Sequence, residues 1–408
     1  MAIAQGIRKQ LVYVKEASWG VAPPAATAVQ TIRRVTGQFN LKKDTYQSEE
    51  IRTDYQMADF RHGIRSADGS LNGEFSPGTY APFVSAALAR AFSAITTTSP
   101  GSVTVAGTGP SYTISRATGS YLTDGIKIGH VVRFTGLNAN NNNKNLLVTD
   151  LTGTLLTVVV LNGTTLTAET VATGGAYTVP GRENYVPTTG HTDDSFTFED
   201  RQADVPYYER FVGLKVNSLA VSIPANGLST VDVAFMGKDM DRGASTPYFT
   251  GTVNAEGTTG IFAGVNGALI LNGAVVGFVT SVDFTVNRNL TMEPVVGSNV
   301  NPDIFEGRCL VDGTFSAYFF DGVAPELFAS ETETSLVVAL TTSNANNADF
   351  VTVSLPRIKV NGSDKDDGEK GIIRTYPFQA LYNFAGGAAV KTQATTIQIQ
   401  DSTVTTSI

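Results

Sequence analysis

The sequence contains few of the residues from which compact chemical sites are usually built. Its 408 residues include one cysteine, Cys309, one tryptophan and three histidines. A single cysteine cannot form an internal disulfide, which excludes a secreted disulfide scaffold. We expect Cys309 to be a buried free thiol, because cysteine packs as a small hydrophobic residue.

Recognisable catalytic and metal-binding motifs are also missing. His62, His130 and His191 lie in separate segments, without the HExxH or Cys/His spacing that brings metal ligands together. No GxSxG motif occurs, and the glycine-rich stretch at 251–267 lacks the GK[ST] ending of a phosphate-binding loop. We interpret that stretch as a flexible linker.

Carboxylates need separate consideration, because a glycosidase requires only two of them. Acidic residues gather between Glu49 and Glu74, in a turn-rich region that is typical of a solvated surface. The loop GSDKDDGEKG at 362–371 predicts an exposed hairpin tip, since its Asp spacing does not fit an EF-hand. We therefore expect no catalytic residue, no metal site and no cofactor, and hence a protein that is not an enzyme.

Charge and long apolar runs are scarce as well. Charged residues make up 16% of the chain, and 37 acidic against 29 basic residues give a net charge of -8. Tight nucleic-acid binding is disfavoured, because it needs a basic surface. No run approaches the roughly 18 to 20 apolar residues of a membrane span, and the N-terminus lacks the apolar core of a signal peptide. We expect synthesis in the cytoplasm and retention there unless a larger assembly carries the protein out.

The residues that are abundant favour β structure. Glycine occurs 40 times, and Thr, Val, Ser and Asn recur throughout, which is typical of a β-rich chain of two or three compact units. From about Ser99 to Arg182, short strands such as TLLTVVVL at 154–161 alternate with Gly- and Asn-rich turns. This region predicts a small all-β domain, with 140–143 in a solvated loop.

Two stretches of the chain are nearly the same. ADGSLNGEF at 67–75 matches VDGTFSAYF at 311–319, and six identities fall within 25 positions at an offset of 244. Composition alone would give on the order of one or two identities. In each copy Asp-Gly predicts a turn, followed by an alternating strand and then a short helix. The identical pairs are Asp59 with Asp303, Gly63 with Gly307, Asp68 with Asp312, Gly69 with Gly313, Phe75 with Phe319 and Gly78 with Gly322.

Further along, the offset between the copies becomes smaller. Leu214-Lys215-Val216-Asn217 matches Ile358-Lys359-Val360-Asn361 at an offset of 144, which locates 100 additional residues between Phe83 and Leu214. A third match, at an offset of 146, pairs Ala234-Phe235-Met236 with Ala380-Leu381-Tyr382. The pattern predicts a duplicated β unit with an insertion. The predicted divisions are 1–98 and 183–245 for the first unit, 99–182 for the inserted all-β domain, 246–267 for the linker and 268–408 for the second unit.

Two stretches point to a known family: EASWGVAPPA at 16–25, and residues 33–87, which contain DTYQSEEIRTDYQMADFRHG. Through them, roughly the first 90 residues resemble the tail tube proteins of long-tailed, siphovirus-like bacteriophages. The resemblance implies a β-sandwich with a flanking short helix, stacked rings, and inner sheets that join into one barrel through which the genome passes at infection. With its two copies, the chain resembles a subclass that carries two tube domains per chain, which implies a pseudo-hexameric ring of three chains.

The resemblance also implies where the protein acts and with what. We expect a structural protein of the virion tail, assembled in the host cytoplasm, whose partners are other copies of itself, the tape measure, tail terminator and distal tail proteins, and transiently the passing DNA. The alternative is a carbohydrate-binding or adhesive multidomain β protein, which would need exposed aromatic platforms. The inserted domain should project outward, and its deletion should leave tubes intact.

Two groups of residues are candidates for assembly. The long polar segments at 43–63 and 288–307 exceed the usual two to five residues of a hairpin turn and are predicted to connect successive rings. The channel should be acidic or neutral, with contributions from Glu74 and Asp283. The predicted contacts between rings are Tyr46, Glu49, Glu50, Tyr55, Met57, Phe60, Val295, Val296, Ile304 and Phe305.

Overall fold

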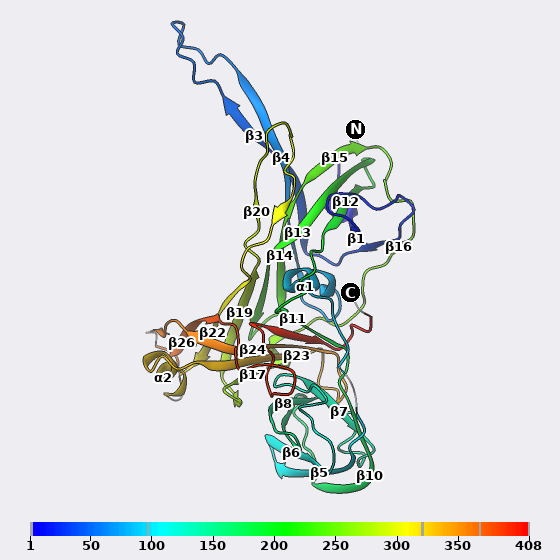
Figure 1. The fold of residues 1–408 in the computed structure, drawn as a ribbon, viewed down its shortest axis with the longest axis vertical. Helices are drawn as coiled ribbons and strands as arrows, with labels where there is room; N and C mark the ends of the chain where they lie inside the picture. The colour runs from blue at the N-terminus through cyan, green and yellow to red at the C-terminus, as the bar shows by residue number, and fades with distance from the viewer. Residues whose placement is uncertain (1–2, 96–97, 320–321, 367–368, 407–408) are drawn as a thin grey trace.

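A computed structural model describes residues 3–95, 98–319, 322–366 and 369–406 (Figure 1). This part of the chain is nearly all β, with two short α-helices, α1 (Ala81–Leu88) and α2 (Val323–Ala329). The predicted all-β fold with minor helix is therefore confirmed. Helix α1 begins with proline near its N-terminus and ends where Ala89 adopts a left-handed conformation.

Six antiparallel strands make up the main framework of the first half of the fold. Their order is β1-β12-β13-β14-β4-β3. The long strand β13 pairs with β12 along its first part and with β14 along its later part. The strands are β1 (Lys9–Lys15), β3 (Thr36–Gln47), β4 (Phe60–Glu74), β12 (Phe196–Gln202), β13 (Tyr207–Pro224) and β14 (Thr230–Gly237).

The second half repeats this arrangement. Its order is β17-β23-β24-β26-β22-β19, with α2 following β22 as α1 follows β4. The strands are β17 (Gly267–Leu271), β19 (Val279–Asn287), β22 (Leu310–Tyr318), β23 (Thr334–Thr341), β24 (Phe350–Val360) and β26 (Ile373–Ala380).

Short elements complete the two halves. They are the 3-10 helices η1 (Gly6–Arg8) and η2 (Gly264–Asn266), and the strands β2 (Val29–Thr31), β11 (Arg182–Tyr185), β15 (Asp239–Ala244), β16 (Val253–Asn254), β18 (Ala274–Val276), β20 (Thr291–Met292), β21 (Ile304–Phe305), β25 (Asp364–Lys365) and β27 (Gln398–Asp401).

One seam joins the halves. The C-terminal part of β13 pairs antiparallel with β19, with Val221 opposite Phe284. The pairing creates a continuous inner sheet with the order β3-β4-β14-β13-β19-β22-β26-β24. Apolar side chains alternate toward one face of this sheet and form a core that extends across both halves.

The strand registers support one predicted match and correct another. Lys215 lies opposite Met236, and Lys359 lies opposite Gln379, in agreement with the offset of 144. The predicted pairing of Ala234 with Ala380 is wrong. Leu71 lies opposite Val233 on β14. Phe315, the counterpart of Leu71, lies opposite Tyr376 on β26, so strands β14 and β26 correspond at an offset of 143. A shift of three residues would exchange the buried and the polar face of a strand.

The Asp-Gly pairs predicted to form turns lie inside strands β4 and β22. Packing gives the reason. A Cβ atom on Gly69 would lie 2.0 Å from the ring of Phe39, and one on Gly313 would lie 2.3 Å from the carbonyl oxygen of Asp283. These glycines allow a close approach to neighbouring strands, which is a recognised role of glycine within a sheet.

The insertion contains a closed six-stranded barrel, at the lower end of Figure 1. Its own core is separate from the main one and includes Phe134 and Tyr177. The order is β10-β5-β6-β9-β8-β7, formed by β5 (Gly101–Thr108), β6 (Ser111–Arg116), β7 (Val131–Thr135), β8 (Leu146–Leu151), β9 (Leu155–Val160) and β10 (Glu169–Thr178).

This barrel is docked firmly on the second half. The Lys127 ammonium donates hydrogen bonds to the carbonyl oxygens of Gly387, Ala388 and Val390 at 2.6 to 2.8 Å. A shared apolar cluster of buried side chains closes the junction, and burial of each such side chain stabilises it by roughly 1.5–3 kcal/mol. The cluster contains Val131 and Leu147 of the barrel with Ile270, Val337, Ala339 and Phe350 of the second half.

The segment predicted to be a flexible linker is held at several points. Phe249 is buried, and β16 pairs with β2. Phe262 is also buried, with its ring centroid 5.3 Å from that of Phe75. The path between the halves is thus fixed by packing on the first half.

Candidate assembly interface

The side of the inner sheet that faces away from the core is polar. Two rows of cross-strand neighbours, called the polar face below, contain four carboxylates, and the second row ends at one lysine, Lys359 of β24, opposite Gln379. The first row is Glu74, Thr230, Ser222, Asp283, Thr314 and Pro377, and the second is Thr36, Asn72, Asp232, Ala220, Thr285, Asp312, Gln379 and Lys359.

The two residues predicted to line a channel therefore lie in one row of this face. Glu74 is on β4 of the first half and Asp283 is on β19 of the second. Hydrogen bonds hold some of the acids in place. Ser222 donates to Asp283, and Asn72 donates to Asp232 at 2.7 Å. Three of the four carboxylates line a shallow hollow in the sheet.

Both ends of the inner sheet have an open edge. Within the described residues, β3 pairs only with β4, and the segment Gly362–Asp366, which contains β25, pairs only with β26. The equivalent part of β13, Ser218–Ser222, pairs with β14 on one side and with β19 on the other. An open edge presents unpaired backbone groups to a further strand.

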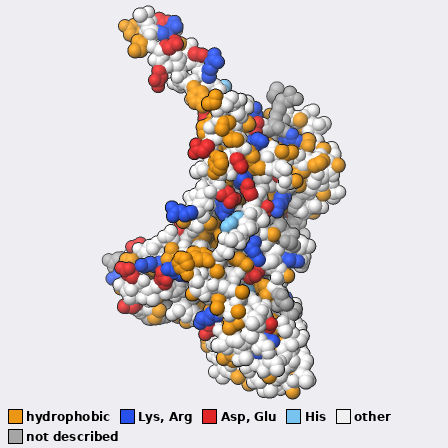
Figure 2. Space-filling model, in the orientation of Figure 1, with side chains coloured by type: hydrophobic (Ala, Val, Ile, Leu, Met, Phe, Trp, Pro, Cys, Tyr) orange, Lys and Arg blue, Asp and Glu red, His pale blue; other side chains and the backbone are white. Residues whose placement is uncertain are grey.

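A long hairpin of β3 and β4 projects from the body of the molecule (Figures 1 and 2). The predicted contact residues Tyr46, Glu49, Glu50, Tyr55, Met57 and Phe60 are all exposed on it. At the tip, Tyr55 is 99% exposed and adopts φ 56°, and Ile51, which the sequence did not single out, is 102% exposed. The Arg52 guanidinium, which donates hydrogen bonds to Asp54, lowers the pKa of that carboxyl.

The equivalent segment of the second half, residues 288–309, runs beside the first half. The backbone N–H of Arg65 donates to the Asn299 carbonyl at 2.8 Å. The predicted contact residues Val295, Val296 and Phe305 are exposed.

Ile304 cannot serve as a surface contact. Its side chain is 2% exposed, and its carbonyl oxygen accepts a hydrogen bond from Lys215. The prediction for Ile304 was wrong because alternating residues of the short strand β21 point to opposite sides.

The other residues considered from the sequence lie apart from these surfaces. His62 and His191 are exposed, whereas His130 is buried 3.1 Å from Glu183. Burial is the largest single influence on Glu183 and opposes its charge, but the hydrogen bonds and charges of His130, Arg90 and Gln398 together outweigh it and lower the pKa of this carboxyl. Cys309 is half-buried, and burial raises the pKa of its thiol.

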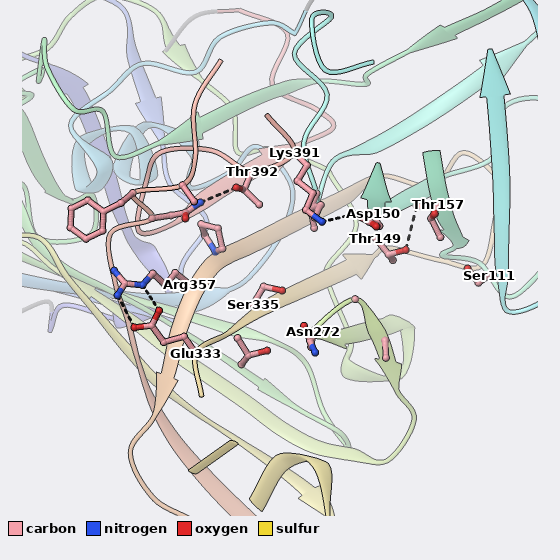
Figure 3. Close-up of a pocket in the computed structure, with 18 residues that line it drawn as sticks. Ser111, Thr149, Asp150, Thr157, Asn272, Glu333, Ser335, Arg357, Lys391 and Thr392 are labelled. Carbon is pink, nitrogen blue, oxygen red and sulfur yellow. Dashed lines mark hydrogen bonds and ion pairs between the residues drawn. The ribbon is translucent and has the colours of Figure 1, made fainter. Parts of the chain in front are cut away.

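A cleft of about 890 Å³ lies between the barrel and the second half (Figure 3). Ion pairs line it. Arg357 forms a two-fold contact with Glu333 at 2.6 and 2.7 Å, and Lys391 lies 3.0 Å from Asp150. Each charge thus has an opposite partner, and the lining contains neither histidine nor cysteine. Of these pairs, only Lys391 with Asp150 connects the second half to the barrel, since Arg357 and Glu333 both belong to the second half.

Two structural findings bear on other kinds of site. Across the described ranges, no three histidine, cysteine or carboxylate side chains come together as they would around a metal ion. Among the helices described, none has the length and apolar character needed to cross a membrane.

Aromatic platforms are not present on the barrel. Its four aromatic side chains, Tyr112, Tyr121, Phe134 and Tyr177, are all buried. Trp19 lies elsewhere, with its indole N–H donating to the Gly213 carbonyl at 3.0 Å. A sugar-binding surface of stacked aromatic rings is therefore not formed by these residues.

Comparison with known proteins agrees with the geometry. A family model described as phage tail tube protein matches residues 6–380, which is most of the chain. No curated protein matches the sequence. Members of this structural, non-enzymatic family assemble into a tube with other tail components. The chain belongs to the phage tail tube protein family and is a structural component of the virion tail.

Proposed function

We propose that three copies of the chain close into a ring whose polar face lines a channel for DNA, and that rings stack to form the tube of a siphovirus-like tail. The observation that carries this proposal is the open edge at each end of the inner sheet. Inside the chain, the seam between β13 and β19 joins two equivalent units, and the same pairing between chains would remove both open edges.

The internal seam supplies a register for the contact between chains. Ala220 lies opposite Asp232 on one side and Thr285 on the other. Its counterpart is Asp364, which lies opposite Thr375. The counterpart of Thr285 is Asn40, because Thr285 lies opposite Asp312 and Asn40 lies opposite Asp68, the residue that matches Asp312. The proposed ring therefore places Asp364 of one chain opposite Asn40 of the next.

The charge of the polar face fits a channel through which DNA slides. Four carboxylates per chain outnumber the one lysine of the same rows, Lys359, which is paired with Glu331 at 3.1 Å, so the face would repel phosphates. The channel would carry the genome during ejection through the host cell envelope. Three chains with two units each would supply the six units of a pseudo-hexameric ring.

The inserted barrel would lie on the outside of the ring. In β17 and β23, residues such as Leu269 and Leu336 face the core, whereas Ile270 and Val337 face the barrel. The core thus separates the barrel from the polar face, and the barrel cannot obstruct a channel formed by that face. The separation supports the division at 99–182 and the outward position of this domain.

Assembly would take place in the host cytoplasm. The ends of the tube and its interior would require the tail terminator, distal tail and tape measure proteins as further partners. We also propose that the two halves arose by duplication, because strand order, strand register and the position of the helix all recur.

The contact between chains can be tested by charge. Asn40→Asp places a carboxylate opposite Asp364 and should weaken the ring, since like charges directly opposite across strands are destabilising by about 0.2–1 kcal/mol per pair. Asn40→Lys, at the same position, should preserve it. Sedimentation velocity across a dilution series measures the ring fraction, and Asp364→Lys should restore assembly of Asn40→Asp. Unchanged assembly of Asn40→Asp, or no rescue, would contradict this register.

A further inference from the structure

We propose that an exposed apolar surface beside α2 binds the N-terminal segment of a second copy of the chain. The surface, called the α2 surface below, consists of Phe319, Phe328 and Ile372, all of which are exposed. The inference rests on the proposed ring and adds a contact that the pairing of sheet edges does not require.

The residues of the first half that correspond to the α2 surface are buried within the chain. Phe75 corresponds to Phe319, and Val84 corresponds to Phe328, in both cases at the offset of 244. Phe75 and Val84 are 6% and 7% exposed, whereas Phe319 and Phe328 are each 43% exposed. Large apolar side chains thus occupy positions in the second half whose counterparts are buried by the adjoining unit.

Phe262 is the residue that covers Phe75. The N–H of Phe262 donates to the Phe75 carbonyl at 3.0 Å, and the N–H of Ser229 donates to the Phe262 carbonyl at 2.9 Å. Phe75 itself donates to the Ser229 carbonyl at 2.8 Å. Phe262 therefore extends a small backbone ladder formed by Phe75 and Ser229.

One of these backbone hydrogen bonds has a counterpart on the α2 surface. The N–H of Phe319 donates to the Ile372 carbonyl at 2.8 Å, as Phe75 donates to Ser229. Arg374 lies over the Phe319 ring at 4.1 Å, so that ring already has one packing partner within its own chain. Among the residues that the structure describes, none takes the place beside Phe319 that Phe262 takes beside Phe75.

The N-terminal segment is the counterpart of the one that contains Phe262. Phe262 precedes η2 and β17, and the N-terminal residues precede η1 and β1 in the same way. Gly6 and Gly264 each begin the 3-10 helix, so Ala4 takes the place of Phe262. Ile3, next to Ala4, is an exposed apolar side chain that binding to the α2 surface would bury.

A second contact belongs to the same interface. Val84 shares a small cavity with Val351 and Val353 of the second half. The counterpart of Val351, at the offset of 144, is Tyr207, an exposed aromatic residue at the start of β13. Tyr207 of the neighbouring chain would therefore approach Phe328 as Val351 approaches Val84.

The segment must come from another copy. The backbone N–H of Gln5 donates to Asp204 at 2.6 Å and holds the N-terminal segment beside the first half of its own chain. In Figure 1 the N-terminus lies near β15, far from α2 at the opposite side of the molecule. The proposed ring would bring the N-terminal side of one chain against the α2 side of the next.

Cysteine cross-linking tests this contact in the full chain. Ala4→Cys with Ile372→Cys, in a Cys309→Ser background, should give disulfide-linked dimers and trimers on a non-reducing gel after mild oxidation. The matched control pair is Ala4→Cys with Ala172→Cys, which is exposed on the inserted barrel and should not cross-link. Rings without specific cross-links would overturn the inference but leave the proposed ring intact, whereas a parent chain that forms no rings would overturn both.

A second measurement does not depend on disulfide geometry. Phe328→Ser should raise the concentration at which rings dissociate by about tenfold or more, while the melting temperature of the dissociated chain stays the same, because Phe328 is exposed there. Val390→Ser, at a similarly exposed apolar side chain outside the proposed contacts, should leave ring dissociation unchanged. Equal effects of the two substitutions would contradict a specific contact at the α2 surface.

Discussion

Gly69 and Gly313 leave space in which an aromatic ring from a neighbouring strand packs directly against the backbone. Each glycine follows an aspartate, and from the sequence this pair indicates a turn. The structure places both pairs inside long strands, because Phe39 lies over Gly69 and Phe378 lies 2.7 Å from the Cβ position of Gly313. Local sequence cannot reveal this role, since it depends on a side chain from another strand.

Gly69→Ala should destabilise the fold by about 1–3 kcal/mol, the usual cost of adding a methyl group to a filled space. The added Cβ would overlap the Phe39 ring, which is buried in the core. Urea unfolding of the dissociated chain measures the effect. Gly277→Ala is the control, because no atom lies within 4 Å of its Cβ position. Equal stability of the two variants would show that the close approach at Gly69 does not constrain the fold.

Buried asparagine is a second feature that local sequence conceals. The run 140–143 was predicted to be a solvated loop, but Asn141 is buried and its amide donates to the Thr167 carbonyl at 2.7 Å. Asparagine favours loops in general, and only the folded barrel shows that this loop is tied to the neighbouring chain segment.

Among the elements, the hairpin of β3 and β4 contains strand residues that the alternation of apolar and polar residues does not predict. The polar stretch after Leu41 was predicted to be a long loop, and alternation is weak there because both faces are exposed. The structure extends β3 to Gln47 and begins β4 at Phe60, which leaves 48–59 as the tip. The exposed apolar residues could be predicted from their position in a polar segment, but the paired strands that carry them could not.

Substitution of Tyr55 and Phe60 by Ser should give rings that no longer lengthen into tubes. Both side chains are exposed on the projecting hairpin, and each would contribute on the order of 1 to 3 kcal/mol if it were fully buried between rings. Negative-stain electron microscopy distinguishes rings from tubes. Val390→Ser, at an exposed site away from the hairpin, is the control. Tubes of normal length would reject the stacking role, and an unfolded chain would indicate a role in the core instead.

For the whole molecule, the pattern of burial explains the order of layers: polar face, inner sheet, core, outer strands and docked barrel. The sequence correctly predicted the β-rich fold, because the composition that favours strands extends over the whole chain. The bounds of the inserted domain stay a prediction. The sequence did not predict the docking of the barrel, because Ile270 and Val337 alternate with core residues in strands that are buried on both faces. Such strands show no polar side from which an outer contact could be recognised.

Docking changes the expected result of deleting the insertion. Replacement of 99–181 by a short Gly/Ser linker should lower the melting temperature and promote aggregation, because Ile270, Val337 and Phe350 would become exposed. The same deletion with Ile270→Ser and Val337→Thr should recover solubility. Differential scanning fluorimetry and light scattering follow both properties. A deletion as stable and soluble as the full chain would show that the barrel is only an appendage.

The central claim is that the polar face lines a channel closed by pairing of β3 with Gly362–Asp366 of the next chain. Electron cryomicroscopy of the purified, concentrated protein tests it most directly. We predict rings of three chains in which Glu74 and Asp283 face the lumen and Asn40 lies opposite Asp364 of the neighbouring chain. Chains that stay monomeric at high concentration, or rings whose lumen is lined by a continuous belt of lysine and arginine, would contradict the account.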